Sequence, residues 1–488
     1  MIRSQNRCLS LLLTVLGVFA LLAVGNAHAN ANANPGAALI WGSCPGGGGP
    51  DGVECALLQV PVDWAEPDGR RLTLAVGRLK ADGPGPAEGT LLVNYGGPIG
   101  TQIEIMRDRT FTPDFQPFAD LRHTMNIVTW DLRGYPGLSS PTVCGGPADV
   151  PHGQRYPRLP RDQAGFDALA TANRAAISAC RDKDPGLFDS LDSATFARDA
   201  DAVRQALGEG RINLYMGSYG SVIGEAYANL FPGHVRTMMI DGGFDHAGSS
   251  DVEDQARARD NEQQAQRFFG WCASTSSCVL HGRNVPRIWR ALVARAESVP
   301  IPAPQFGAAY DGTQLQWHLI EAIVRAEQQP APDPGWGQLA QAIQRAEAGD
   351  ASGFGADTRD LPFTPCLDWP RPTGYGALAA TQARLARIAP DTGSANTTVW
   401  RALECVGWPA PMTNPPRPFP PGVPPLLGAG TWAEFGATAR VVRHVPGSFA
   451  IRHDGGGHEL YATGNRCVIA YADTYFTTRR LPAPGSRC

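Results

Sequence analysis

The sequence lacks the features that mark several classes of protein. Its cysteines and histidines show neither the CxxC nor the HExxH spacing of zinc sites, which argues against a zinc protein. The formal net charge of −4 gives no electrostatic reason to expect a nucleic-acid or anionic-membrane partner. What the chain does have is length, 488 residues of which 43% are hydrophobic. This is enough for a large core together with one large insertion or a second domain.

The N-terminus has no acidic residue in its first 50 positions and carries the pattern of an export signal. Arg3 and Arg7 form a short basic region, an apolar run follows over residues 11–24, and small residues surround a cleavage point after Ala29. The apolar run is short for a membrane span. We therefore predict that residues 1–29 are a signal peptide and that the mature protein is secreted or periplasmic, without membrane attachment.

Ten cysteines remain after this segment, and an even number in an oxidising compartment predicts disulfide bonds. Spacing does not fix their connectivity. The simplest pairing joins each cysteine to its next neighbour: Cys44–Cys55, Cys144–Cys180, Cys272–Cys278, Cys366–Cys405 and Cys467–Cys488.

Short apolar runs alternate with longer helical stretches, the pattern of an α/β fold with a mixed, mostly parallel sheet. The strand-like runs are residues 56–62, 71–79, 90–94, 125–130, 212–215, 236–240, 425–428 and 449–453. Residues 194–207 predict an amphipathic helix with Ser193 as its N-cap and Gly208 after its last turn.

Regular strand-like runs disappear between residues 246 and 408, where Ala, Gln, Arg and Glu are frequent. We interpret this stretch as a largely helical insertion, a cap on the α/β core. The core then consists of residues 30–245 and 426–488, and the Pro-rich residues 409–425 form an extended connector between cap and core.

The strongest chemical signal is the segment around Ser218, where a predicted strand passes directly into a helix across Gly217-Ser218-Tyr219-Gly220. This context fits a nucleophile elbow, in which a cramped turn exposes a serine. The usual pattern is G-x-S-x-G, and here Met216 replaces its first glycine. We predict that Ser218 is the catalytic nucleophile.

An acyl-transfer site also needs oxyanion donors and a general base. Gly97, in the loop after the strand at 90–94, and Tyr219, the residue after the nucleophile, are the expected amide donors. His458 follows a strand-like run and three glycines near the C-terminus, which makes it the expected base. His453 is a rival, but it ends the predicted strand.

Five segments occur in a fixed order along most of the mature chain. They are residues 55–63, Tyr95-Gly-Gly-Pro98, residues 131–141 with Cys144, Gly217-Ser-Tyr-Gly220 with Phe231-Pro232 and Ile240-Asp-Gly242, and residues 455–488. Together they resemble the secreted tripeptidyl-aminopeptidase-like branch of the proline-iminopeptidase α/β-hydrolases. The resemblance implies a serine exopeptidase acting on free N-termini beneath a helical cap. It also implies that cap carboxylates hold the substrate ammonium, for which Glu253 and Asp254 are candidates.

One feature of that family is missing. Its triad acid lies in an Asp-x-x-Thr-Pro segment, whereas residues 425–436 of this chain contain no aspartate. Three alternatives are open. Glu434 reaches His458, Asp241 at the end of the preceding strand replaces the acid, or water or backbone takes its place and turnover is weak.

Three functions therefore compete: an exported aminopeptidase, a carboxylesterase of the same fold, and a hydrolase-like binding protein with weakened turnover. The first two use Ser218 and His458 in acyl transfer to a peptide or ester substrate and need no metal or organic cofactor.

Overall fold

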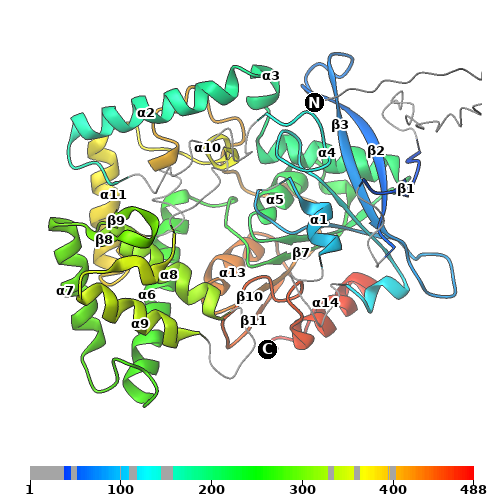
Figure 1. The fold of residues 1–488 in the computed structure, drawn as a ribbon. Helices are drawn as coiled ribbons and strands as arrows, with labels where there is room; N and C mark the ends of the chain where they lie inside the picture. Colours follow the sequence, from blue (N-terminus) through cyan, green and yellow to red (C-terminus); the bar gives the residue numbers. More distant parts are fainter. Residues whose placement is uncertain are drawn as a thin grey trace, which may run out of the picture. The chain divides into compact units, whose positions relative to one another are not determined.

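A mixed sheet of nine strands organises the computed structural model (Figure 1). The structure describes residues 38–45, 52–98, 100–108, 118–143, 158–327, 335–356, 363–393, 395 and 403–488. The predicted signal peptide lies outside the described residues. The strands, in spatial order, are β1 (Gly42–Ser43), β2 (Glu54–Pro61), β3 (Arg71–Leu79), β5 (Asn126–Trp130), β4 (Thr90–Asn94), β6 (Ile212–Gly217), β7 (Val235–Asp241), β10 (Leu427–Gly430) and β11 (Phe449–Arg452).

The strand directions agree with the α/β class predicted from the sequence. Strands β1, β2 and β3 pair antiparallel, β3 also pairs antiparallel with β5, and every pair from β5 to β11 is parallel. Strands β4 and β6 are buried along their whole length, which is why they appear in the sequence as continuous apolar runs.

Parallel pairing brings the C-terminal ends of the central strands to one edge of the sheet. Asn94 of β4 pairs with Met216 of β6, and Gly217 of β6 pairs with Asp241 of β7. Asp241 pairs in turn with Ala429 of β10. Loops that leave these strands therefore converge, and this edge is where ligands bind in open α/β sheets.

Helices connect and cover the strands. They are α1 (Gln102–Arg107), α2 (Gln163–Arg181), α3 (Pro185–Phe188), α4 (Ser193–Ala206), α5 (Gly220–Leu230), α13 (Phe435–Arg443) and α14 (Arg466–Thr478). Helix α4 corrects one prediction. Its N-cap is Asp192, whose carboxylate accepts the Thr195 amide at 2.8 Å, rather than Ser193. The Ser193 hydroxyl instead donates to Asp368 at 2.6 Å.

A mainly helical segment interrupts the sheet between β7 and β10. It contains α6 (Ser250–Ser274), α7 (Val285–Ser298), α8 (Gly312–Glu327), α9 (Trp336–Glu347), α10 (Thr364–Asp368), α11 (Tyr375–Ile388) and the hairpin of β8 (Ile301–Ala303) with β9 (Ala308–Tyr310). Helices α6 to α9 enclose their own apolar cluster around Trp289 and Phe268. The described residues 409–426 contain neither helix nor strand.

Helix α2 belongs to the first half of the chain but packs against this inserted segment. Phe166 of α2 shares an apolar cluster with Leu378 of α11 and with Leu403 and Val406. The Asn173 side chain donates to the backbone carbonyls of Leu403 and Val406, at 2.7 and 2.9 Å. The inserted segment therefore contacts a helix from the first half of the chain as well as its own helices.

Four disulfides join cysteines in the predicted next-neighbour pattern: Cys44–Cys55, Cys272–Cys278, Cys366–Cys405 and Cys467–Cys488. Cys180 is also disulfide-bonded, and its predicted partner Cys144 lies outside the described residues. None of the described helices combines the length and the apolar character needed to span a membrane.

Candidate active site

Ser218 occupies the turn between β6 and α5 in a left-handed backbone conformation, with φ of 48°. A non-glycine residue rarely adopts such a φ, and strained residues of this kind cluster at functional sites. The Ser218 amide donates to the Asp241 carbonyl of the neighbouring strand at 2.9 Å. The strand–turn–helix context therefore has the backbone geometry of a nucleophile elbow.

Glycines around this turn explain how Met216 is tolerated in place of the usual glycine. A Cβ atom on Gly224, in α5, would lie 2.8 Å from Cγ of Met216. A Cβ atom on Gly220 would lie 2.6 Å from Oδ1 of Asn94. The space for close strand–helix packing is thus supplied by the helix, and the strand can carry the larger side chain.

The loop after β4 is held by side chains rather than by regular backbone pairing. Asn94 Oδ1 accepts the Gly96 amide at 2.9 Å. Gln102 accepts the Tyr95 amide at 2.7 Å and donates to the Gly96 carbonyl at 3.0 Å. Gly97 has a φ of 113°, and its amide donates no backbone hydrogen bond within the described part of the chain. The Gly97 amide can therefore be offered to a ligand.

Tyr219 is the N-cap residue of α5, so its amide lies at the positive end of the helix dipole. Gly96, next to Gly97, approaches the elbow closely, because a Cβ atom on Gly96 would lie 2.7 Å from Cβ of Ser218. The two amides predicted for the oxyanion site thus border the same serine.

Glu434 forms a hydrogen bond to Nδ1 of His458. Glu434 follows β10 as the N-cap residue of α13, and His458 follows β11, the next strand of the sheet. The other carboxylate oxygen of Glu434 accepts the Thr431 hydroxyl at 3.1 Å. Gly242, with φ of 68°, leaves the room for this carboxylate, since a Cβ atom there would lie 2.9 Å from Glu434 Oε2.

The two partners shift each other's protonation. Burial works against the charged imidazole, but the neighbouring Glu434 outweighs it and raises the pKa of His458 to about 9. Burial alone would raise the pKa of Glu434, yet the attraction and hydrogen bond of His458 leave it below the ordinary value. The Glu434 side chain is 7% exposed and that of His458 31%, so the carboxylate lies inside and the imidazole reaches the surface.

Asp241, the alternative acid, has other hydrogen-bond partners. Its carboxylate accepts the amides of Leu460 and Tyr461 at 3.0 and 2.8 Å, and the Tyr215 hydroxyl at 2.9 Å. Burial raises the pKa of Asp241 to about 7. Asp241 therefore anchors the chain just after His458, whereas Glu434 contacts the ring itself.

His453, the rival base, continues the pairing of β11 with β10 through its amide, which donates to the Gly430 carbonyl at 3.0 Å. Its ring faces the Asn465 side chain at 3.4 Å. These contacts belong to the end of the strand rather than to the Ser218 turn.

The two candidate ammonium ligands differ in their surroundings. Glu253 is fully buried and forms ion pairs with Arg257 and Arg440, the first at 2.8 Å. Arg257 also donates to the Gly243 carbonyl at 2.7 Å, so this network links α6 to the loop after β7. Asp254 instead lines a cavity of about 180 Å³ together with Trp369.

Residues of the insertion hold the side chain next to the nucleophile, a contact that no sequence pattern predicts. The Tyr219 hydroxyl donates to Asp368 at 2.8 Å and accepts the Trp369 indole N–H at 3.2 Å. Tyr219, Phe244 and Trp369 pack in one buried cluster. Residues 219 and 369 are 150 positions apart, and no motif joins them, so only the fold could reveal the contact.

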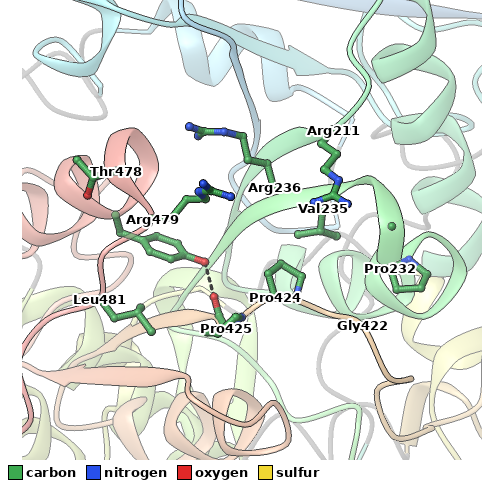
Figure 2. A pocket seen from close by; sticks show the side chains of 12 residues that line it. Arg211, Pro232, Val235, Arg236, Gly422, Pro424, Pro425, Thr478, Arg479 and Leu481 are labelled. Carbon is green, nitrogen blue, oxygen red and sulfur yellow. Dashed lines mark hydrogen bonds between the residues drawn. The ribbon is translucent and has the colours of Figure 1, made fainter.

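A larger cavity, of about 470 Å³, lies elsewhere (Figure 2). Its lining includes Arg211, which precedes β6, and Val235, which begins β7. These are the N-terminal ends of strands whose C-terminal ends carry Ser218 and Asp241. The larger cavity is therefore at the opposite edge of the sheet from the predicted catalytic residues.

Gly217 is expected to be intolerant of alanine. An added Cβ would lie 2.8 Å from Cδ of Glu459, a buried side chain beneath the turn. We expect Gly217→Ala to lower the free energy of unfolding by about 1–3 kcal/mol, because the buried Glu459 side chain must shift. Chemical denaturation measures the effect. Adding Glu459→Ala should recover most of the loss, and Gly210→Ala, which has open space, is the matched control. A loss unchanged in the double variant would contradict the contact.

Comparisons with known proteins agree with the α/β fold described above. Residues 116–310 match the family model of the alpha/beta hydrolase fold, and residues 391–488 match the model described as TAP-like protein. The chain is 26% identical to the tripeptidyl aminopeptidase of Streptomyces lividans, over 93% of this chain and 87% of the relative. It is 26% identical to the serine protease Hip1 of Mycobacterium tuberculosis, over 90% and 88%. It is 28% identical to carboxylesterase B of Mycobacterium tuberculosis, over 89% and 86%.

Among solved structures, proline iminopeptidase of Mycobacterium smegmatis aligns at 14% identity with a TM-score of 0.41, covering 86% of this chain and 97% of that one. The sequence relatives span nearly the whole chain. The first family model includes strands β5, β6 and β7, and the second includes β10 and β11. This chain therefore has the α/β-hydrolase fold, is similar to tripeptidyl aminopeptidases over most of its length, and is a serine hydrolase.

Proposed function

We propose that the protein is an exported aminopeptidase that releases short peptides or residues from free N-termini through an acyl-enzyme on Ser218. His458 is the general base, Glu434 orients its ring, and the amides of Gly97 and Tyr219 bind the oxyanion. The observation that carries the proposal is the hydrogen bond between Glu434 and His458, at the strand edge where the Ser218 turn also lies.

The chemistry is stepwise acyl transfer. His458 removes the hydroxyl proton of Ser218 as the oxygen attacks the substrate carbonyl, and the two amides stabilise the negative oxygen that forms. His458 then gives the proton to the leaving amine, and the same groups activate water to release the acyl group. Glu434 keeps the Nδ1 proton in place, so that the other ring nitrogen is the one that accepts.

Preference for a free N-terminus is supported by the surroundings of Tyr219. Trp369 contacts the Tyr219 hydroxyl and also lines the cavity that contains Asp254. A peptide whose carbonyl lies at Ser218 can extend over these two aromatic residues toward that carboxylate. We propose Asp254 as the ammonium ligand rather than Glu253, because two arginines neutralise Glu253.

Export is supported by the four described disulfides and by the signal-like N-terminus. Disulfides of this kind persist in oxidising compartments and are rare in reducing ones. Fractionation of cells that express the full chain tests this part. We expect N-terminal sequencing to show that the exported form begins directly after Ala29.

Paired substrates test the preference for a free amine. We expect a tripeptide p-nitroanilide with a free N-terminus to be hydrolysed with a kcat/KM at least about 100-fold above that of its N-acetylated form, because acetylation removes the positive charge that the Asp254 carboxylate is proposed to bind. Asp254→Asn should raise KM for the free peptide about 10-fold or more while leaving hydrolysis of p-nitrophenyl acetate unchanged. Equal rates for free and blocked peptides would overturn the aminopeptidase assignment.

The second candidate is a carboxylesterase, favoured by the 28% identity to carboxylesterase B. The same assay separates the two functions. An esterase is expected to hydrolyse p-nitrophenyl esters of short acids efficiently and to ignore the charge of the peptide N-terminus.

A further inference from the structure

Glu459, directly after His458, combines three unusual features. Its backbone φ is 52°, in the left-handed region that non-glycine residues rarely adopt. Its side chain is buried, with 2% of the residue exposed. Its Oε1 atom has no hydrogen-bond partner among the described residues. Nearly all buried polar atoms in proteins are hydrogen-bonded, so this carboxyl group calls for a physical explanation.

The carboxyl group lies against the two backbones that form the reaction centre. A Cβ atom on Gly217, the last residue of β6, would lie 2.8 Å from Cδ of Glu459. A Cβ atom on Gly96, in the predicted oxyanion loop, would lie 3.2 Å from Oε1 of Glu459 and 2.7 Å from Cβ of Ser218. Both positions are glycine, and the Glu459 side chain occupies the space that a larger residue at either position would need.

The titratable groups around Glu459 come from several neighbouring strands and loops. They are His458 on its own loop, Asp241 at the end of β7, Glu434 after β10, and the phenols of Tyr95 after β4 and Tyr215 in β6. Burial raises the pKa of Glu459 to about 8, while the positive charge of His458 opposes this rise. Glu459 in turn favours the charged form of His458, in addition to the larger effect of Glu434.

We propose that Glu459 is a positioning residue of the hydrolytic centre, a second carboxyl group that stabilises the imidazolium of His458 during acyl transfer. The proposal rests on the proposed role of His458 as the general base. Glu434 holds Nδ1 of the ring through a direct hydrogen bond, whereas Glu459, from beneath the elbow, acts through the negative charge that it carries above its pKa of about 8. In a standard triad a single aspartate orients the histidine ring and stabilises its charged form, and here Glu434 and Glu459 share these two roles.

A packing role does not explain these features. An apolar side chain of similar size would fill the same space without leaving a buried oxygen unpartnered. Residues that keep both a left-handed backbone and an unpaired buried polar atom are expected where function requires them. Glu459 meets both conditions at the residue next to the base.

The test is the titration of the His458 ring, followed by NMR in folded protein labelled with ¹³C at histidine Cε1. The His458 signal is assigned by its absence from the His458→Gln variant. In Glu459→Gln, which keeps the size and removes the charge, we expect the midpoint to move to lower pH by about 0.5 unit or more, since a negative neighbour is lost. Glu88→Gln, an exposed glutamate before β4, is the matched control and should not move it.

The outcomes are distinct. An unchanged His458 midpoint in folded Glu459→Gln overturns the proposal, and a fall in stability alone indicates packing. Glu459→Asp, which keeps the charge, should retain a midpoint closer to that of the wild type and provides a second variant. The titration does not depend on turnover. A shifted midpoint in a protein that cleaves no peptide would therefore refute the aminopeptidase function and leave the Glu459–His458 coupling in place.

Discussion

Ser218→Ala is expected to fold normally and to lose about 10⁶-fold in kcat, because removal of a serine nucleophile eliminates the acyl-enzyme route. Hydrolysis of a free tripeptide p-nitroanilide measures the loss. Alanine keeps the Cβ atom that packs near Gly96, so the melting temperature should stay close to that of the wild type. A variant that keeps more than about a tenth of the wild-type rate would place the nucleophile elsewhere.

Glu434→Gln is expected to lower kcat by about 10³–10⁴-fold, because the amide cannot stabilise the imidazolium and allows the wrong ring tautomer. The pH dependence should change as well. Glu434 raises the pKa of His458 to about 9, so kcat/KM of the wild type rises with pH until the ring loses its proton. Without Glu434 the pKa of His458 falls. The acid limb of the profile, over which kcat/KM rises with pH, should therefore move to lower pH. Rate profiles between pH 5 and pH 10 measure both effects.

Asp241→Asn distinguishes the two acids. It removes one acceptor from the clamp on Leu460 and Tyr461, so its main expected effect is on stability. If Asp241→Asn lost the activity and shifted the acid limb while Glu434→Gln kept both, the orienting role would belong to Asp241.

Most of the fold was predictable because buried parallel strands appear in the sequence as nearly continuous apolar runs. The run at 90–94 is strand β4 to the residue, and the run at 449–453 differs from β11 by one. The cap of helix α4 was not predictable, since Ser193 and Asp192 both suit an N-cap. The choice depends on Asp368, which binds the serine hydroxyl from a helix far along the chain.

The site was predictable only in part, for a related reason. The Ser218 turn and the position of His458 after a late strand are local patterns. Glu434 and Asp241 both follow neighbouring strands, however, and spacing does not report which carboxylate touches the ring. Hydrogen bonds decide it, with Glu434 on His458 and Asp241 on the following amides. No sequence pattern indicated a role for Glu459, because the role depends on its contacts with Gly96 and Gly217, which only the fold brings together.

Reaction with a fluorophosphonate probe, followed by peptide mapping, tests most directly whether Ser218, His458 and Glu434 work as one catalytic unit. We expect one label per chain, on Ser218, and much slower labelling in His458→Gln and Glu434→Gln at equal stability. No labelling of the folded wild-type protein, a label on another residue, or an unchanged labelling rate in Glu434→Gln would contradict it.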